Sequence, residues 1–346
     1  MTMGLMGFIW TILRYPFQNA AGRITFGYGA AARQQFQTLT GVDPVELDPV
    51  EDRSLWGLWT QFRTDQVNGF VQEAARNVRR LNPDVILSAA VFALPDNERQ
   101  QKLQQDWETW INAGDIDLLV PMTYTLDTRR LAQMVEPNLD IVSRSPILFL
   151  PSLKLLEMPK VEFLDQMQVV RDLPTGGYAL FAVRHLTDEL QEVLRQSSIS
   201  STQVPYRQPF LAAQARFAVL EQEWEFLLEQ EEITIFEPER SQWLQTVAET
   251  AAALEALAAN PSSEGLRVAQ SSMQTFQQQF SNWMRLDALQ HPYRISTWLN
   301  RMAAIEVLLR YGERTALPRT PPVRNWDSPH RNLVDPQHSA DRENGH

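Results

Sequence analysis

Aromatic, guanidinium and hydroxyl side chains follow apolar segments in the first half of the sequence. Arg14 and Tyr15 follow an apolar segment near the N-terminus, and Thr123 and Tyr124 end the segment 117–124. Sugar C–H faces stack on aromatic rings, while sugar hydroxyls accept hydrogen bonds from charged donors. We therefore predict that these four residues bind a polyhydroxyl ligand. For the aromatic rings, packing within the protein interior is the alternative.

Acidic side chains near the same segments occupy positions typical of helix starts. They are Asp96, Glu98, Asp127, Glu157 and Asp188. Each lies at least two residues beyond an apolar segment, where a carboxylate favourably meets a helix dipole. Glycoside hydrolysis needs two carboxyl groups about 5–5.5 Å apart for retention, or about 6.5–9.5 Å apart for inversion. The sequence indicates no such pair, so we predict capping roles and leave the catalytic residues unassigned.

Other catalytic and cofactor-binding patterns are missing from the sequence. Gly27-Tyr28-Gly29 is a lone Gly-x-Gly that does not directly follow a predicted strand, which favours a loop over phosphate binding. The absence of cysteine excludes thiolate metal ligands and a cysteine nucleophile. His185 is the only histidine before residue 197, and we interpret it as a surface residue at a strand end. We expect neither a metal nor a cofactor.

Apolar segments alternate with helical periodicity up to residue 196, a pattern typical of parallel strands covered by helices. Strands are expected at 7–13, 85–92, 117–124, 147–153 and 177–183. Helices are expected near 30–39, 55–81, 100–112, 129–135 and 161–171. In such βα architectures, functional side chains lie just beyond the C-terminal ends of the strands. The predicted ligand-binding residues all follow such ends.

The pattern changes after residue 196. Residues 197–204 are rich in Ser and Thr and indicate a linker, and residues 205–317 carry four apolar series with a period near 3.6. The series run over 210–227, 243–254, 266–283 and 295–309, and predict an all-α helical bundle domain. Residues 318–346 are polar and rich in proline without periodicity, so we expect a disordered tail.

The overall charge restricts the partners of the protein. A net charge of -11 disfavours nucleic acid, because no basic stripe offsets it. The apolar run 5–13 is too short for a membrane span of about 20 residues and lacks the features of a signal peptide. We therefore expect no membrane span, and the compartment stays open.

Several motifs resemble one known family, in the order in which that family has them. The segment 7–16, which ends in Arg14-Tyr15-Pro16, resembles the fourth-strand motif of the glycosyl-hydrolase-like family 10 barrels. Phe62-Arg63 and the segments 88–92, 117–124 and 176–181 resemble motifs that run through strands five, six and eight of the same family. The resemblance covers residues 7–195. It implies a (β/α)8 barrel that acts on glycosidic bonds through carboxylates, usually in exported proteins.

The resemblance predicts an α/β fold in which residues 1–196 form the C-terminal part of a (β/α)8 TIM barrel, followed by the all-α bundle. About five βα units would correspond to strands four to eight, with strands one to three missing. Thr11 takes the position of the family's strand-four aspartate. We expect an N-terminally incomplete glycoside hydrolase-like protein that binds or acts on a polysaccharide or oligosaccharide, with no hydrolysis by this chain.

Two further expectations concern association. A non-catalytic interaction protein that uses the helical bundle is the alternative function. Open barrel edges and an uncovered apolar inner face also predict self-association, because unpaired strand groups are templates for pairing.

Overall fold

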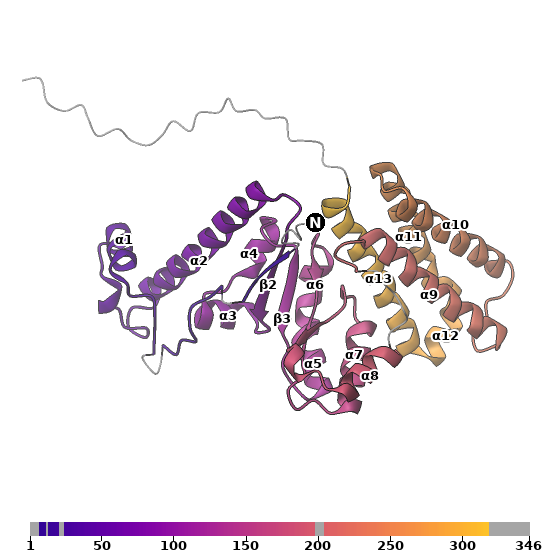
Figure 1. Ribbon diagram of the computed structural model, residues 1–346, viewed down its shortest axis with the longest axis horizontal. Helices are drawn as coiled ribbons and strands as arrows, with labels where there is room; N and C mark the ends of the chain where they lie inside the picture. The colour runs from indigo at the N-terminus through magenta and orange to yellow at the C-terminus, as the bar shows by residue number, and fades with distance from the viewer. Residues whose placement is uncertain (1–6, 12, 21–23, 198–203, 318–346) are drawn as a thin grey trace, which may run out of the picture.

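A computed structural model describes residues 7–11, 13–20, 24–197 and 204–317 (Figure 1). The predicted tail 318–346 and most of the predicted linker lie outside the described residues. The fold is α/β with parallel strands, and the α/β fold expected from the sequence is confirmed at this level. No described helix is both long enough and apolar enough to cross a membrane.

The described strands form two parallel groups. They are β1 (Gly7–Trp10), β2 (Ile86–Phe92), β3 (Leu118–Met122), β4 (Leu148–Phe149), β5 (Ser152–Lys154) and β6 (Ala179–Phe181). The first four form one sheet in the order β1-β2-β3-β4, and β5 pairs with β6. The single strand expected at 147–153 is therefore wrong, because Pro151 between β4 and β5 has no N–H group to donate to a ladder.

Most helices expected among the strands are confirmed. The helices in this part are α1 (Ala30–Thr40), α2 (Arg53–Leu81), α3 (Asp96–Leu103), α4 (Trp107–Asn112), α5 (Thr128–Val135), α6 (Leu139–Ser143), α7 (Lys160–Asp172) and α8 (Asp188–Ser197). Three short 3-10 helices are η1 (Pro44–Glu46), η2 (Glu136–Asn138) and η3 (Val183–His185). The helix expected at 100–112 is wrong in its bounds, since Gln104 adopts a left-handed conformation, with φ 49°, that ends α3.

The two faces of β2 have different neighbours. Leu87, Ala89 and Val91 are buried in a core with α2 and α4. On the other face, Ile86 at the start of the strand is buried, while Phe92 at its end is only half-buried. Because side chains alternate along a strand, this second face becomes accessible towards the C-terminal end of the sheet.

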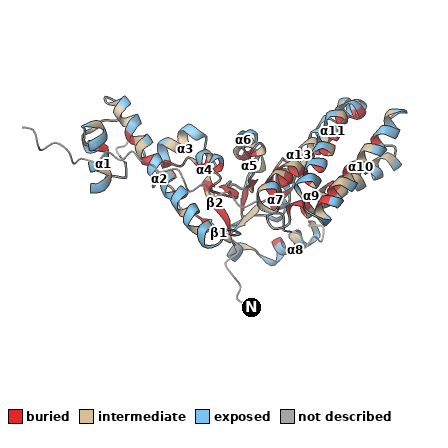
Figure 2. Cartoon of the chain, turned by 90° about the horizontal axis from the view of Figure 1, so that it is seen from above, coloured by how far each residue is buried: buried red, intermediate tan, exposed pale blue. Residues whose placement is uncertain are grey.

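The second part of the chain consists of helices around one core. They are α9 (Pro209–Glu229), α10 (Glu239–Ala259), α11 (Ser263–Trp283), α12 (Arg285–Gln290) and α13 (Pro292–Thr315). All four long helices expected from the sequence are confirmed, and α12 is an addition. Trp224, Trp243, Phe276 and Trp298 lie together at the centre of this core. Figure 2 shows buried residues on the sides of these helices that face one another.

The same helices cover the N-terminal end of the sheet. Their core includes Ile86, Leu118 and Leu148, the first residues of β2, β3 and β4. Helix α13 also contacts α6, α7 and β4. The expectation of an uncovered inner face is thus wrong at this end of the sheet, because helices distant in sequence pack against it.

Candidate substrate-binding face

Arg14 lies among aromatic rings at the C-terminal ends of β1 and β2. Its guanidinium carbon is 4.8 Å from the ring centroid of Phe92 and 5.6 Å from that of Phe17. Phe17 and Phe92 meet edge to face at 4.8 Å, and Phe17 is exposed. Burial lowers the pKa of Arg14. Its Nε atom is buried without a hydrogen-bond partner in the described part of the chain.

Tyr15 is held beside a buried arginine. The guanidinium of Arg63 lies 5.9 Å from the Tyr15 ring centroid, and burial lowers the pKa of Arg63 to about 10. Arg63 donates to Gln18 Oε1 at 2.5 Å and to the Phe26 carbonyl at 2.8 Å. Gly27 lies next to the Tyr15 ring and has φ +104°. A Cβ atom at this position would lie 2.9 Å from Tyr15 Cε1. The loop predicted around Gly27 is confirmed, and it packs against the ring of Tyr15.

Thr123 and Tyr124 follow β3 but have different surroundings. Thr123 is fully buried, and its hydroxyl donates to the Ser152 carbonyl at 2.9 Å, which joins β3 to β5. Tyr124 is half-buried, and burial raises its pKa. Its ring stacks on Phe181, at the end of β6, with centroids 5.1 Å apart and an interplanar angle of 14°.

The four predicted ligand-binding residues follow the C-terminal ends of β1 and β3, with β2 between these strands. Among the described residues, no hydrogen bond or ring contact joins Arg14 and Tyr15 to Thr123 and Tyr124. The rings of Phe17, Phe92 and Phe181 extend the same edge, and the sequence prediction did not include them among the binding residues. Phe92 ends the strand expected at 85–92, so its position was the signal that could have identified it, whereas the strand expected at 177–183 placed Phe181 in its interior.

The acidic residues mostly lie at helix starts, as expected. Asp127 caps α5 by accepting from the Arg130 N–H at 2.7 Å. Asp96, Glu98 and Asp188 lie in the first turns of α3 and α8. The expectation of a capping role is wrong for Glu157, which lies in the loop before α7 with φ 58°.

Other functional expectations can be placed on the structure. Thr11 is exposed after β1. His185 is half-buried in η3, where its Nε2 accepts from Arg184 Nε at 3.0 Å. The described residues contain no group of three or more His, Asp or Glu side chains that could hold a metal.

The family description Glycosyl hydrolase-like 10 matches residues 20–145. The family resemblance expected from the motifs is thereby confirmed over this segment. The match begins after Arg14-Tyr15-Pro16 and ends before β5 and β6. The resemblance of residues 7–19 and 146–195 to this family therefore stays a prediction.

The solved structure of the PgaB (BpsB) glycoside hydrolase domain from Bordetella bronchiseptica is similar at 14% sequence identity with a TM-score of 0.40. The alignment covers 50% of this chain and 53% of that chain, so the present chain spans about half the length of that domain. A likeness this distant supports no inference about function. No curated protein matches the sequence.

Proposed function

We propose that the chain is a glycoside hydrolase-like protein that binds a polysaccharide or oligosaccharide at the C-terminal ends of its strands. In this proposal, the strands are the C-terminal part of a (β/α)8 barrel, and the helices after residue 204 form a bundle domain. The family match over residues 20–145 supports the glycan as the ligand class. The strand order β1-β2-β3-β4 with parallel pairing supports the barrel wall.

The stacked pair of Tyr124 and Phe181 is the observation that carries the proposal. Phe181 is 51% exposed at a strand end, although burial of an aromatic ring would stabilise the folded protein. Its partner Tyr124 fixes the ring plane and carries a hydroxyl group beside it. A flat apolar surface next to a hydroxyl fits the C–H face and the hydroxyls of a sugar ring.

Arg14 and Tyr15 would form a second part of the same binding face. The Arg14 guanidinium is fixed over Phe92 and beside the exposed ring of Phe17. Arginine has five N–H donors, which can bind sugar hydroxyls or a carboxylate. Thr123 would not contact the glycan, because it is fully buried and its hydroxyl already donates to the Ser152 carbonyl.

We infer binding without hydrolysis. Thr11 has no carboxylate to act as nucleophile or general acid at the position of the strand-four aspartate. Asp96 and Asp127 are engaged in an ion pair with Arg99 and in a helix cap, respectively. The carboxylates that glycoside hydrolysis requires are therefore not supplied by these residues.

A Phe181→Ala variant tests the proposal. We expect soluble neutral, N-acetylated or acidic oligosaccharides to bind the wild-type chain in calorimetric titrations, with an affinity about tenfold lower after loss of the ring. Phe236→Ala is the matched control, since Phe236 is 58% exposed after α9 and lies outside the proposed face. Equal affinity of the three proteins, or no binding to any sugar class, would contradict it.

The same samples separate binding from catalysis. Release of reducing sugar above the buffer level, abolished by Tyr124→Ala, would contradict the absence of hydrolysis. The alternative function, an interaction protein that uses the helices, is favoured by Leu289 and Tyr293, which are both highly exposed around the start of α13. Absence of sugar binding together with capture of a partner through these two side chains would support that alternative.

A further inference from the structure

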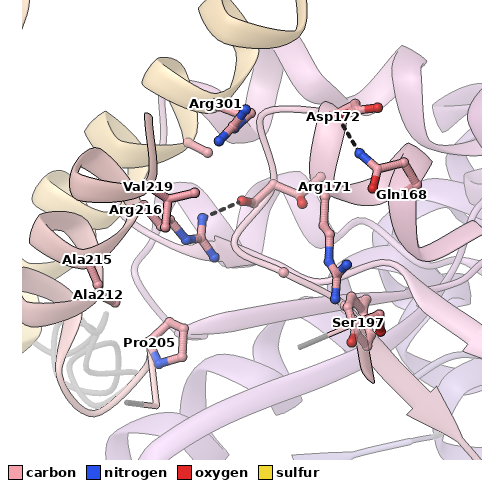
Figure 3. A pocket seen from close by; sticks show the side chains of 14 residues that line it. Gln168, Arg171, Asp172, Ser197, Pro205, Ala212, Ala215, Arg216, Val219 and Arg301 are labelled. Carbon is pink, nitrogen blue, oxygen red and sulfur yellow. Dashed lines mark hydrogen bonds between the residues drawn. The ribbon is translucent and has the colours of Figure 1, made fainter. Parts of the chain in front are cut away.

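A cavity of about 590 Å³ lies between α7 and the helices α9 and α13 (Figure 3). Its walls are the C-terminal end of α7, the loop 173–178, the facing sides of α9 and α13, and the residues Ser197 and Pro205. This loop leads into β6, so the cavity lies towards the N-terminal end of that strand, away from Phe181. Pockets of about 300–1,000 Å³ are the usual size for small organic ligands.

Arg216 of α9 presents its guanidinium group to this cavity. It donates to the Thr175 carbonyl at 3.2 Å and to the Gly176 carbonyl at 2.7 Å. No carboxylate of the described chain forms an ion pair with it, and burial lowers its pKa to about 10. A guanidinium group has five N–H donors, so the two carbonyls leave donors for a ligand.

Arg171 of α7 and Arg301 of α13 also line the cavity. Arg301 pairs with Glu223 at 2.5 Å, and this carboxylate also accepts from Trp298 Nε1. Among the described residues that line the cavity, Asp172 is the only acid, and it accepts from the Tyr293 hydroxyl at 3.0 Å and from Gln168. The three guanidinium groups therefore exceed the two carboxylates by one positive charge, within a chain of net charge -11.

One wall of the cavity is apolar. It is formed by Ala212, Ala215 and Val219 of α9 and by Ala304 of α13. Small side chains on neighbouring turns leave a smooth surface that fits a flat or aliphatic group. The cavity thus combines an apolar surface and the Arg216 guanidinium group, both from α9, with the Arg171 guanidinium group, which comes from α7.

We propose that this cavity binds a small organic anion whose carboxylate or phosphate group meets Arg216 and Arg171 and whose apolar body lies against α9. Guanidinium groups recognise both oxyanions through paired N–H donors. This site is separate from the proposed glycan-binding face and does not depend on it.

Calorimetric titration of the full chain with three matched probes tests the proposal. Benzoate and phenyl phosphate carry the two anionic groups, and benzyl alcohol is the neutral counterpart. We expect at least one anion to bind in the millimolar range or tighter, and benzyl alcohol to bind about tenfold more weakly or worse. The stronger of the two anions identifies the oxyanion that the site prefers.

Arg171→Met is the decisive variant, because Arg171 forms no ion pair in the described structure and its loss should leave the fold intact. We expect it to weaken anion binding about tenfold, while Arg267→Met, which removes an exposed arginine of α11, leaves binding unchanged. Arg216→Lys keeps the charge but loses the planar fork, so it should weaken binding as well. Failure of both anions to bind, equal binding of benzyl alcohol, or wild-type affinity of Arg171→Met would overturn the proposal.

Discussion

The carboxylate of Asp117 connects the sheet to α2 and α13. It is 5% exposed, accepts from the Leu87 N–H at 2.7 Å and pairs with Arg79 at 3.2 Å. It also forms an ion pair with Arg314. When one partner of a buried ion pair is removed, the remaining charges are left uncompensated, and this cost exceeds the value of an exposed pair.

We predict that Asp117→Asn lowers the free energy of unfolding by about 3 kcal/mol, since two guanidinium groups lose their counter-charge. Urea denaturation followed by circular dichroism measures the change. Asp140→Asn is the control, because Asp140 and its partner Arg144 are both exposed, and we expect a loss of about 0–1 kcal/mol. Equal losses of unfolding free energy in the two variants would contradict the prediction that the buried ion pairs of Asp117 stabilise the fold.

Individual side chains of the binding face could be predicted only in part. Arg14 and Tyr15 were identifiable because they directly follow an apolar segment. The burial of Thr123 was not, because its hydrogen bond reaches Ser152, 29 residues away, and no local pattern reports such a contact. The stacking of Phe181 on Tyr124 is also a contact between distant segments.

At the scale of elements, α9 and α13 approach each other closely at a glycine. A Cβ atom on Gly312 would lie 2.4 Å from Phe210 Cε1, which is closer than any real contact of that kind. Glycine inside a helix normally costs about 1 kcal/mol relative to alanine. The position of Gly312 therefore serves the contact between the two helices.

We predict that Gly312→Ala destabilises the protein by about 1–3 kcal/mol, because the added methyl group forces Phe210 to move. Gly69→Ala in α2 is the matched control, since no atom lies within 4 Å of the added Cβ atom. That change should stabilise the protein by up to about 1 kcal/mol through helix propensity. Thermal unfolding of both variants measures the difference, and stabilisation by Gly312→Ala would contradict the close contact.

The helices could be predicted better than the strands for a physical reason. The period of 3.6 residues recurs over many turns in α2, α9, α11 and α13, so the local pattern is redundant. Strands β4 and β5 are two and three residues long, and Pro151 separates them. A continuous apolar run does not reveal which of its residues pair with which neighbour, because pairing depends on distant strands.

At the scale of the whole molecule, β1 is one of the two edges of the described four-stranded sheet. It ends the strand order and pairs only with β2 among the described strands, and its Ile9 side chain is 54% exposed. Edge strands with exposed apolar side chains pair with further chains unless charge or a cover prevents it. The C-terminal helices pack against the N-terminal end of the sheet, and β1 remains at its edge.

We predict that the purified chain self-associates through β1, and that Ile9→Lys shifts it towards the monomer because a charge opposes edge pairing. Light scattering measures the mass of both forms. Val161→Lys is the control, since Val161 is 65% exposed on α7 and lies away from the edge. A monodisperse monomer in the unchanged chain would contradict this prediction.

In the proposed function, the C-terminal helices that share a core with Ile86, Leu118 and Leu148 restrict the direction from which a glycan would approach. A glycan bound at the proposed face cannot be threaded past the strands and out at their N-terminal ends, because the helices fill that exit. Both ends of a long glycan bound at this face would leave on the side of Tyr124 and Phe181. The protein would therefore hold an internal stretch of polymer laid across its surface, and it would not need a free chain end to do so.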